Sequence, residues 1–117
     1  MMFSSPSYSE WKKVLKSDSG INFYIDFDNI RKVDGYVYWW GLIDYLEPIN
    51  NFDLSHKEYN KGDCKLSRYK TLSSISYKEH FGKGTGNFTT PKKLEWIYPK
   101  PNSLAEMFLN LVCNYKK

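Results

Sequence analysis

Long apolar runs are missing from this 117-residue chain. No window approaches the ~18 apolar residues that a membrane-spanning helix needs, so we expect no membrane span. The N-terminus carries neither a basic region nor an apolar segment, and therefore shows no signal peptide in the chain as given. Either the protein stays in the cytosol or a leader has been removed, and these features leave both explanations open.

Strong charge of one sign is also lacking. The chain has 17 Lys and Arg residues against 13 Asp and Glu, a net charge of +4, and its densest basic groups are pairs such as Lys92-Lys93. Proteins that bind nucleic acid usually concentrate their positive charge on one surface. We interpret the scattered charge as solubilising and expect no nucleic-acid partner.

Residues suited to catalysis and metal binding are scarce. The two cysteines cannot complete a tetrahedral metal site alone, and His56 and His80 lack the spacing of zinc motifs. Gly82–Gly86 has the spacing G-x-G-x-G, but no helix pattern follows it, which favours a hairpin loop over a phosphate-binding loop. We therefore expect no enzyme activity, no catalytic residue, no cofactor and no metal site.

The cysteines Cys64 and Cys113 favour a disulfide, with two unpaired structural thiols as the alternative. Closing a loop of about 50 residues would stabilise the fold by ~4 kcal/mol. A disulfide would also place the protein in an oxidising compartment and would favour the removed-leader explanation.

Aromatic residues, by contrast, are abundant. Phe, Trp and Tyr make up 18% of the chain, and its length fits one domain over residues 11–117 after a flexible lead-in at residues 1–10. Rings and β-branched residues in alternating order predict strands. The expected strands are Trp11–Leu15, Ile21–Phe27, Gly35–Pro48, Ser55–Cys64, Leu66–His80 and Leu94–Tyr98. The remaining assignments are a corner or helical turn at Asp28–Val33, a bend or bulge at Lys61–Asp63, and a flexible loop at Gly82–Asn87.

The longest expected strand, Gly35–Pro48, has apolar residues on both faces. Val37 and Trp39 fall on one face, while Tyr38 and Trp40 fall on the other. These rings could stack nucleobases or sugars on a sheet. Core packing and strand pairing are the favoured explanation of them.

The C-terminal segment predicts one helix. Ser103 and Glu106 have the spacing of a capping box. An apolar stripe then follows at helical spacing, made of Leu104, Met107, Phe108, Leu111, Val112 and Tyr115. We expect this stripe to dock on the face of the sheet lined by Ser73, Ser74 and Ser76. Cys113 falls away from the centre of the stripe, which is a point against the disulfide.

The order of elements therefore predicts an α+β fold, an antiparallel meander of about six strands with one C-terminal helix packed across it. The chain also resembles the bacterial surface-adhesin E family, most specifically in Asp63-Cys64-Lys65 and in a helix that ends with Val112-Cys113. The matching segments are Trp11–Val14, Phe23–Arg31, Gly35–Tyr45, Lys57–Lys70, Gly82–Asn87, Glu95–Pro99 and Ser103–Cys113.

This resemblance implies an exported protein, in the periplasm, on the outer surface or secreted, that binds an extracellular or host protein and can form a homodimer. It also implies a curved sheet with the helix held to the concave face by a disulfide between Cys64 and Cys113. From composition, the expected binding contacts are the loop lysines Lys83, Lys92 and Lys93. The alternative function is an intracellular oligonucleotide- or carbohydrate-binding sheet that uses the Trp and Tyr face.

Overall fold

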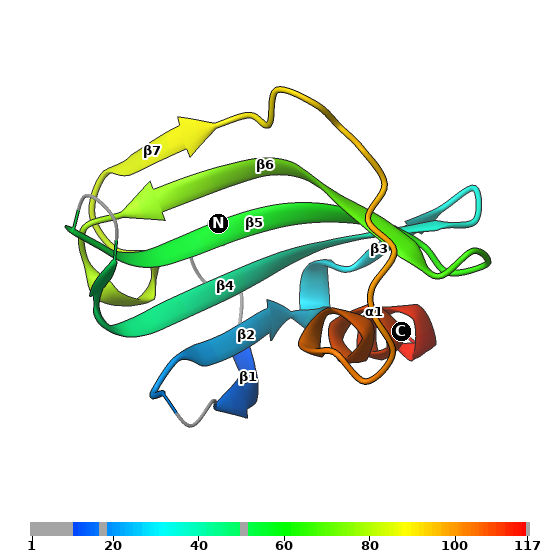
Figure 1. Cartoon of the computed structure of the whole chain (residues 1–117), viewed down its shortest axis with the longest axis horizontal. Helices are drawn as coiled ribbons and strands as arrows, with labels where there is room; N and C mark the ends of the chain where they lie inside the picture. The colour runs from blue at the N-terminus through cyan, green and yellow to red at the C-terminus, as the bar shows by residue number, and fades with distance from the viewer. Residues whose placement is uncertain (1–10, 17–18, 50–51, 117) are drawn as a thin grey trace, which may run out of the picture.

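The computed structural model describes residues 11–16, 19–49 and 52–116, so the lead-in expected at residues 1–10 lies outside the described residues. The chain forms one curved, unclosed antiparallel sheet with a single α-helix against one face (Figure 1). The strands are β1 (Trp11–Lys16), β2 (Asn22–Asp26), β3 (Arg31–Val33), β4 (Tyr36–Ile49), β5 (Asp53–Asp63), β6 (Arg68–Tyr77) and β7 (Gly86–Thr89). The helical segments are η2 (Phe27–Asn29), η4 (His80–Gly82) and α1 (Leu104–Asn114). The predicted α+β class is confirmed, with seven strands rather than about six among the described residues.

The long aromatic strand is the centre of the sheet, as its pattern predicts. β4 pairs with β5 along most of its length and with β2 and β3 on its other side. Val37 and Trp39 are buried on the face that α1 covers, at 1% and 4% exposure. We call this the helix face and the opposite one the outer face. Alternation along β4 therefore assigns its rings to two environments.

Four local predictions need correction. The ambiguous segment Asp28–Val33 contains a strand, β3, and β7 occupies part of the expected loop Gly82–Asn87. The expected strand Leu94–Tyr98 is wrong, because only Ile97 pairs there, as an isolated bridge with Tyr69. The bulge expected at Lys61–Asp63 is also wrong, since that stretch pairs regularly on both sides.

The start of α1 matches its capping signal. The hydroxyl of Ser103 accepts a hydrogen bond from the Glu106 amide at 3.2 Å, as a capping box requires. The Glu106 carboxylate accepts from the Asn102 amide at 2.9 Å, one residue before the cap. The amides of Glu106 and Asn102 are thereby hydrogen-bonded.

The predicted helix stripe is partly wrong. Leu104 and Leu111 are exposed at 45% and 38%, whereas Leu109, which the prediction left out, is 2% exposed. The residues that face the sheet or its core are Ala105, Phe108, Leu109, Val112 and Cys113. They follow the spacing i, i+3, i+4, i+7, i+8, so Cys113 belongs to the buried stripe and the geometric objection to the disulfide disappears.

A covalent link and a lysine hold the end of α1. Cys64, just beyond β5, is joined to Cys113 with their Cα atoms 5.8 Å apart. The Lys32 ammonium donates to the carbonyls of Cys113 and Tyr115 at 3.0 and 2.8 Å. A cation there satisfies carbonyls that have no partner within the helix.

The helix packs against one end of the sheet rather than over its serines. A Cβ atom added at Gly62 would lie 2.8 Å from Leu109 and 2.9 Å from Val37, so the absent side chain lets α1 approach the strands. Ser74 pairs with Glu58, four residues along β5 from Gly62. The predicted docking surface is therefore wrong in position, because the small residue that accommodates the helix is Gly62.

Candidate protein-binding surface

The outer face carries a row of rings built mainly by β4. Tyr36, Tyr38 and Trp40 alternate with the buried residues of that strand and remain partly exposed. Tyr59 of β5 stacks on Tyr38, with ring centres 6.1 Å apart, and contacts Trp40 at 4.9 Å. The row therefore crosses from one strand to the next.

A fifth ring, Trp96, comes from the connection between β7 and α1. The bridge between Ile97 and Tyr69, with hydrogen bonds of 2.7 and 3.0 Å, fixes this connection against β6. The Arg68 guanidinium also donates to the Tyr98 hydroxyl at 3.2 Å. Trp96 is thereby placed over Tyr36, in a stacked pair with centres 6.1 Å apart.

Basic side chains lie over these rings. The Lys61 ammonium is 4.2 Å from the centre of the Tyr36 ring, and Arg68 and Lys70 are 4.2 and 4.4 Å from that of Trp96. Arg31 lies 5.6 Å from Tyr38. Cations at these distances are attracted by the negative faces of the rings. The aromatic–basic face is defined by Arg31, Tyr36, Tyr38, Trp40, Tyr59, Lys61, Arg68, Lys70 and Trp96.

One carboxylate, Asp63, anchors Arg68 within this set of cations. Asp63 accepts from the Arg68 guanidinium at 2.9 Å and from the Leu66 amide at 3.2 Å. Desolvation acts to raise the pKa of Asp63, but these bonds outweigh it and the pKa lies below its ordinary value. The bond to Tyr98 raises the pKa of Arg68, so its charge is retained under all ordinary conditions.

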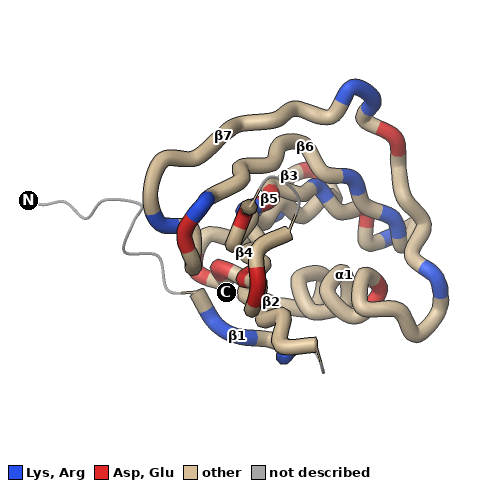
Figure 2. The backbone as a smooth tube through the Cα atoms, turned by 60° about the vertical axis from the view of Figure 1, so that its left-hand side comes forward, with Lys and Arg blue, Asp and Glu red and all other residues tan. Residues whose placement is uncertain are grey.

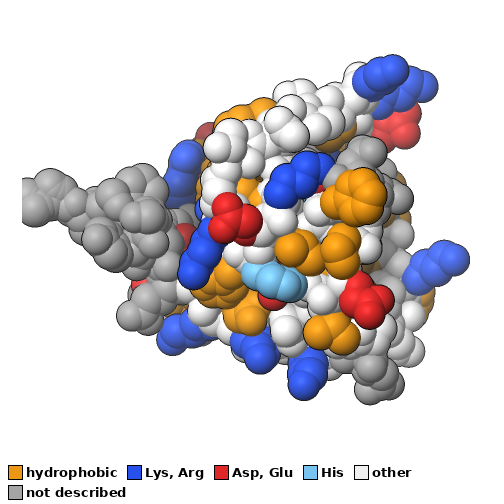
Figure 3. Space-filling model, turned by 90° about the vertical axis from the view of Figure 1, so that its left-hand side faces the viewer, with side chains coloured by type: hydrophobic (Ala, Val, Ile, Leu, Met, Phe, Trp, Pro, Cys, Tyr) orange, Lys and Arg blue, Asp and Glu red, His pale blue; other side chains and the backbone are white. Residues whose placement is uncertain are grey.

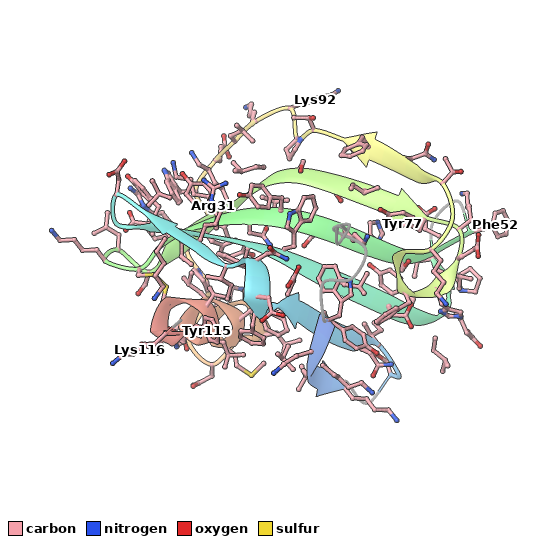
Figure 4. All side chains as sticks on the ribbon, turned by 180° about the vertical axis from the view of Figure 1, so that it is seen from behind. Arg31, Phe52, Tyr77, Lys92, Tyr115 and Lys116 are labelled. Atoms are coloured by element: carbon pink, nitrogen blue, oxygen red, sulfur yellow. A yellow bond between two sulfur atoms is a disulfide. The ribbon has the colours of Figure 1, made fainter. Side chains whose placement is uncertain are left out.

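The loop lysines proposed from composition lie elsewhere. Lys83, Lys92 and Lys93 are all exposed, Lys83 after η4 and the other two in the connection that follows β7. Figure 2 shows basic positions both on the strands and on this connection. In Figure 4, Lys92 stands on the outside of the connection, apart from Arg31. The role of Lys83, Lys92 and Lys93 in binding stays a prediction.

The sequence analysis missed most of the aromatic–basic face. It favoured core packing for Tyr36, Tyr38 and Trp40, which holds in full only for the neighbouring Trp39. Arg68 and Lys70 do share one face of β6, a signal that alternation could have supplied. The position of Trp96 depends on the bridge between Tyr69 and Ile97, which lie 28 residues apart in sequence, and no local pattern encodes that pairing.

A second exposed area lies at the far end of the sheet, where β4 leads to β5. Figure 3 shows apolar side chains around a histidine on this end of the molecule. Leu46 in β4 and Phe52 just before β5 are exposed at 67% and 79%. Figure 4 places Phe52 at the opposite end of the molecule from Tyr115.

Within the described part of the chain, no three His, Cys, Asp or Glu side chains come together in a way that could hold a metal ion. In the same residues, no helix has the length and apolar character needed to cross a membrane.

Comparison with known proteins gives a consistent result. The family model of surface-adhesin protein E matches residues 11–114. Crystal form II of Haemophilus influenzae protein E has a TM-score of 0.65 at 17% identity, covering 97% of this chain and 95% of that one. The selenomethionine form of the same protein has a TM-score of 0.65 at 19% identity, covering 98% of this chain and 96% of that one. Protein E from non-typeable Haemophilus influenzae has a TM-score of 0.62 at 16% identity, covering 97% of this chain and 82% of that one. At these identities the structures show a shared fold, and comparison with curated protein sequences gives no match.

Proposed function

Because this chain belongs to the surface-adhesin protein E family, we propose that it is a non-enzymatic, exported bacterial module that binds an extracellular protein through its aromatic–basic face. A host protein is the expected class of partner for a surface adhesin. The observation that carries the proposal is the cluster around Trp96, a partly exposed ring with two cations within 4.4 Å of its centre.

The composition of this face is that of a protein interface. Tyr, Trp and Arg are enriched in interface cores and among the residues whose truncation weakens binding most. The aromatic–basic face supplies three Tyr, two Trp and two Arg residues, drawn from four strands and a connection. Lysine, which is usually depleted in such interfaces, is here held against rings rather than extended into solvent.

The face is also rigid before a partner arrives. Stacking of Tyr36 on Trp96, and of Tyr38 on Tyr59, fixes rotamers that binding would otherwise have to order. Pre-ordered side chains reduce the entropy lost on association. The cations contribute net positive charge, so an acidic surface on the partner is favoured, with fast association at low ionic strength.

Export is supported by the disulfide. A bond between Cys64 and Cys113 persists in oxidising compartments and is rare where thiols are kept reduced. Periplasmic, surface and secreted locations all satisfy this condition. Alkylation and mass spectrometry of protein taken from its native compartment should find both cysteines blocked, and free thiols there would contradict export.

A homodimer is a further part of the proposal. The sheet ends in β1 and β7 with open edges among the described strands, and exposed edges can pair with another chain. Light scattering at several protein concentrations tests this, with a mass of about twice 13.9 kDa expected for the dimer. A single-chain mass throughout would contradict it.

The binding test uses immobilised full-length chain and a panel of purified extracellular-matrix and serum proteins. We expect at least one to bind, and the double substitution Trp96→Ala with Lys61→Ala to weaken that binding by about 100-fold. A triple variant tests whether the loop lysines contribute to binding; it combines Lys83→Gln, Lys92→Gln and Lys93→Gln. Lys12→Gln is the control. Unchanged binding by the double variant would contradict the proposed face.

The same experiment separates the alternative function. A labelled single-stranded oligonucleotide and a neutral oligosaccharide serve as further probes. If the oligonucleotide bound more tightly than every protein, and the affinity fell steeply with salt, the face would be a polyanion-binding surface instead. We expect neither probe to compete with the bound protein.

A further inference from the structure

A cavity on the helix face, beside the first turns of α1, has no part in the proposed function. Its volume is about 190 Å³. Its walls include one carboxylic acid, Glu58, and five aromatic residues, which are Phe23, Tyr24, Trp39, Tyr69 and Phe108. The rings of Phe23 and Phe108 contact each other with centres 5.3 Å apart, joining β2 to α1. An engineered cavity of about 150 Å³ accepts benzene, so this space suits a ligand of that size class.

Gly41 leaves part of the cavity open. A Cβ atom built at this central position of β4 would have no neighbour closer than 3.8 Å. Glycine weakens the interior of a strand, and there it often marks a place where a ligand or another backbone approaches. The glycine of β5, Gly62, is explained by the close approach of Leu109, whereas Gly41 has no such neighbour.

Glu58 lies directly across from Gly41 in the pairing of β4 and β5. Throughout residues 11–16, 19–49 and 52–116, its side chain forms neither a hydrogen bond nor an ion pair. Burial raises the pKa of Glu58, and the charge of His56 when protonated acts to lower it. An acid in an apolar cavity without a cation is a costly arrangement that a positively charged ligand would relieve.

We propose that this cavity binds a small organic ammonium cation, with the charged head against Glu58 and its alkyl groups among the aromatic side chains. Rings around a carboxylate are the recognised way to hold alkylated ammonium groups, because the ring faces attract the cation while excluding water. Neutral apolar molecules of the same size would fill the volume but leave Glu58 without a counterion. The site lies on the opposite face from the aromatic–basic face, and it is independent of the proposed function.

The first test compares two probes of the same shape on the full chain. Choline and its neutral isostere 3,3-dimethylbutan-1-ol differ in charge while their volumes match. Titration followed by calorimetry, and by the NMR signals of the cavity residues, should show saturable choline binding that is at least about tenfold tighter than that of the isostere. Equal affinities, or no choline binding up to millimolar concentrations, would overturn the proposal.

Variants then locate the site. Glu58→Gln keeps the shape of the side chain and should weaken choline binding about tenfold while leaving the isostere unaffected. Gly41→Leu should fill the cavity and abolish binding of both probes. Glu47→Gln removes an exposed carboxylate from the same sheet and is the control. Unchanged choline binding by Glu58→Gln would overturn the assignment, and the wild-type comparison of the two probes decides the matter even if a variant fails to fold.

Discussion

The two faces of β4 carry similar rings but are stabilised in different ways. On the helix face, Val37 and Trp39 are almost fully buried beneath Leu109 and Val112. On the outer face, Tyr36 stacks on a ring from a distant segment and lies under a lysine, still partly exposed. Burial of apolar surface holds the first face together, while ring stacking and cation contacts organise the second.

This difference indicates how the fold divides stability from recognition. Removing a buried apolar group leaves a cavity and costs several kcal/mol, whereas an exposed cation–π pair contributes about 0.5–1 kcal/mol. Substitutions on the helix face should therefore change the free energy of unfolding. Substitutions on the outer face should change binding instead. The predictions below test this division, beginning with the largest effect on stability.

Breaking the disulfide should cause the greatest loss of stability. Replacing Cys64 and Cys113 together by Ala opens a link across 49 positions and should lower the free energy of unfolding by about 4 kcal/mol. Urea unfolding of wild type and double variant measures the loss. Adding reductant to wild type should reproduce it, and the double variant should not respond to reductant. A loss below about 1 kcal/mol would mean that packing alone keeps α1 on the sheet without the disulfide.

The next prediction distinguishes the observed helix stripe from the one that the sequence predicted. Leu109→Ala should lower the free energy of unfolding by about 3 kcal/mol, because its side chain is buried against Gly62 and the core. Leu111→Ala, the same change two residues along, should cost less than about 0.5 kcal/mol. Thermal and urea unfolding of both variants provide the comparison. Equal losses would contradict the assignment of the buried face.

The glycines of the two central strands offer a third comparison. Gly62→Ala should cost about 2 kcal/mol, since its methyl group would meet Leu109, Val37 and Trp39 at 2.8–3.0 Å. Gly41→Ala adds a methyl group where the nearest atom is 3.8 Å away, and should stabilise the protein by about 0.5 kcal/mol. Denaturation curves of the pair, measured side by side, test whether helix packing is what requires Gly62. A tolerated Gly62→Ala would show that α1 can shift.

Sequence reasoning succeeded where a pattern was long or had one physical meaning. The alternation of β4 identified its two faces, and the spacing of Ser103 and Glu106 located the start of α1. The short strands β3 and β7 were missed because three or four mostly polar residues gain their pairing from neighbours rather than from their own propensity.

The predictions of the helix stripe and of the candidate site failed for different reasons. Leu109 and Leu111 have the same side chain, so hydrophobicity alone could not decide which faces the sheet. Cys113 did carry that information, because a disulfide requires it to point toward β5. The aromatic–basic face depends on Trp96, which a long-range bridge places, and contacts of that kind have no signature in local sequence.

The smallest expected effect concerns Glu58, the one carboxylic acid in the wall of the helix-face cavity. Burial raises the pKa of this carboxyl group in the folded state, so its ionised form is disfavoured there relative to the unfolded chain. Below the ordinary pKa of glutamate, about 4.3, both states are protonated and the penalty is absent. As pH rises through the raised folded-state pKa, the wild type should lose stability that Glu58→Gln retains. The difference should stay below about 1 kcal/mol, since the side chain keeps part of its exposure.

Urea unfolding of both proteins between pH 3.5 and pH 8 measures this difference, with Glu47→Gln as the exposed control. The advantage of Glu58→Gln should be smallest at the acid end and should reach a plateau near neutrality, whereas the control should show no such trend. His56 opposes the shift when it is protonated. Tyr45 and Tyr69 also lie in this region, but burial and the nearby Glu58 raise their pKa values, so both stay neutral over this range. An advantage that instead grew toward acid pH would mean that the folded state favours the ionised carboxylate. The helix face would then already supply a counter-charge, and the contrast between its apolar packing and the charged outer face would no longer hold.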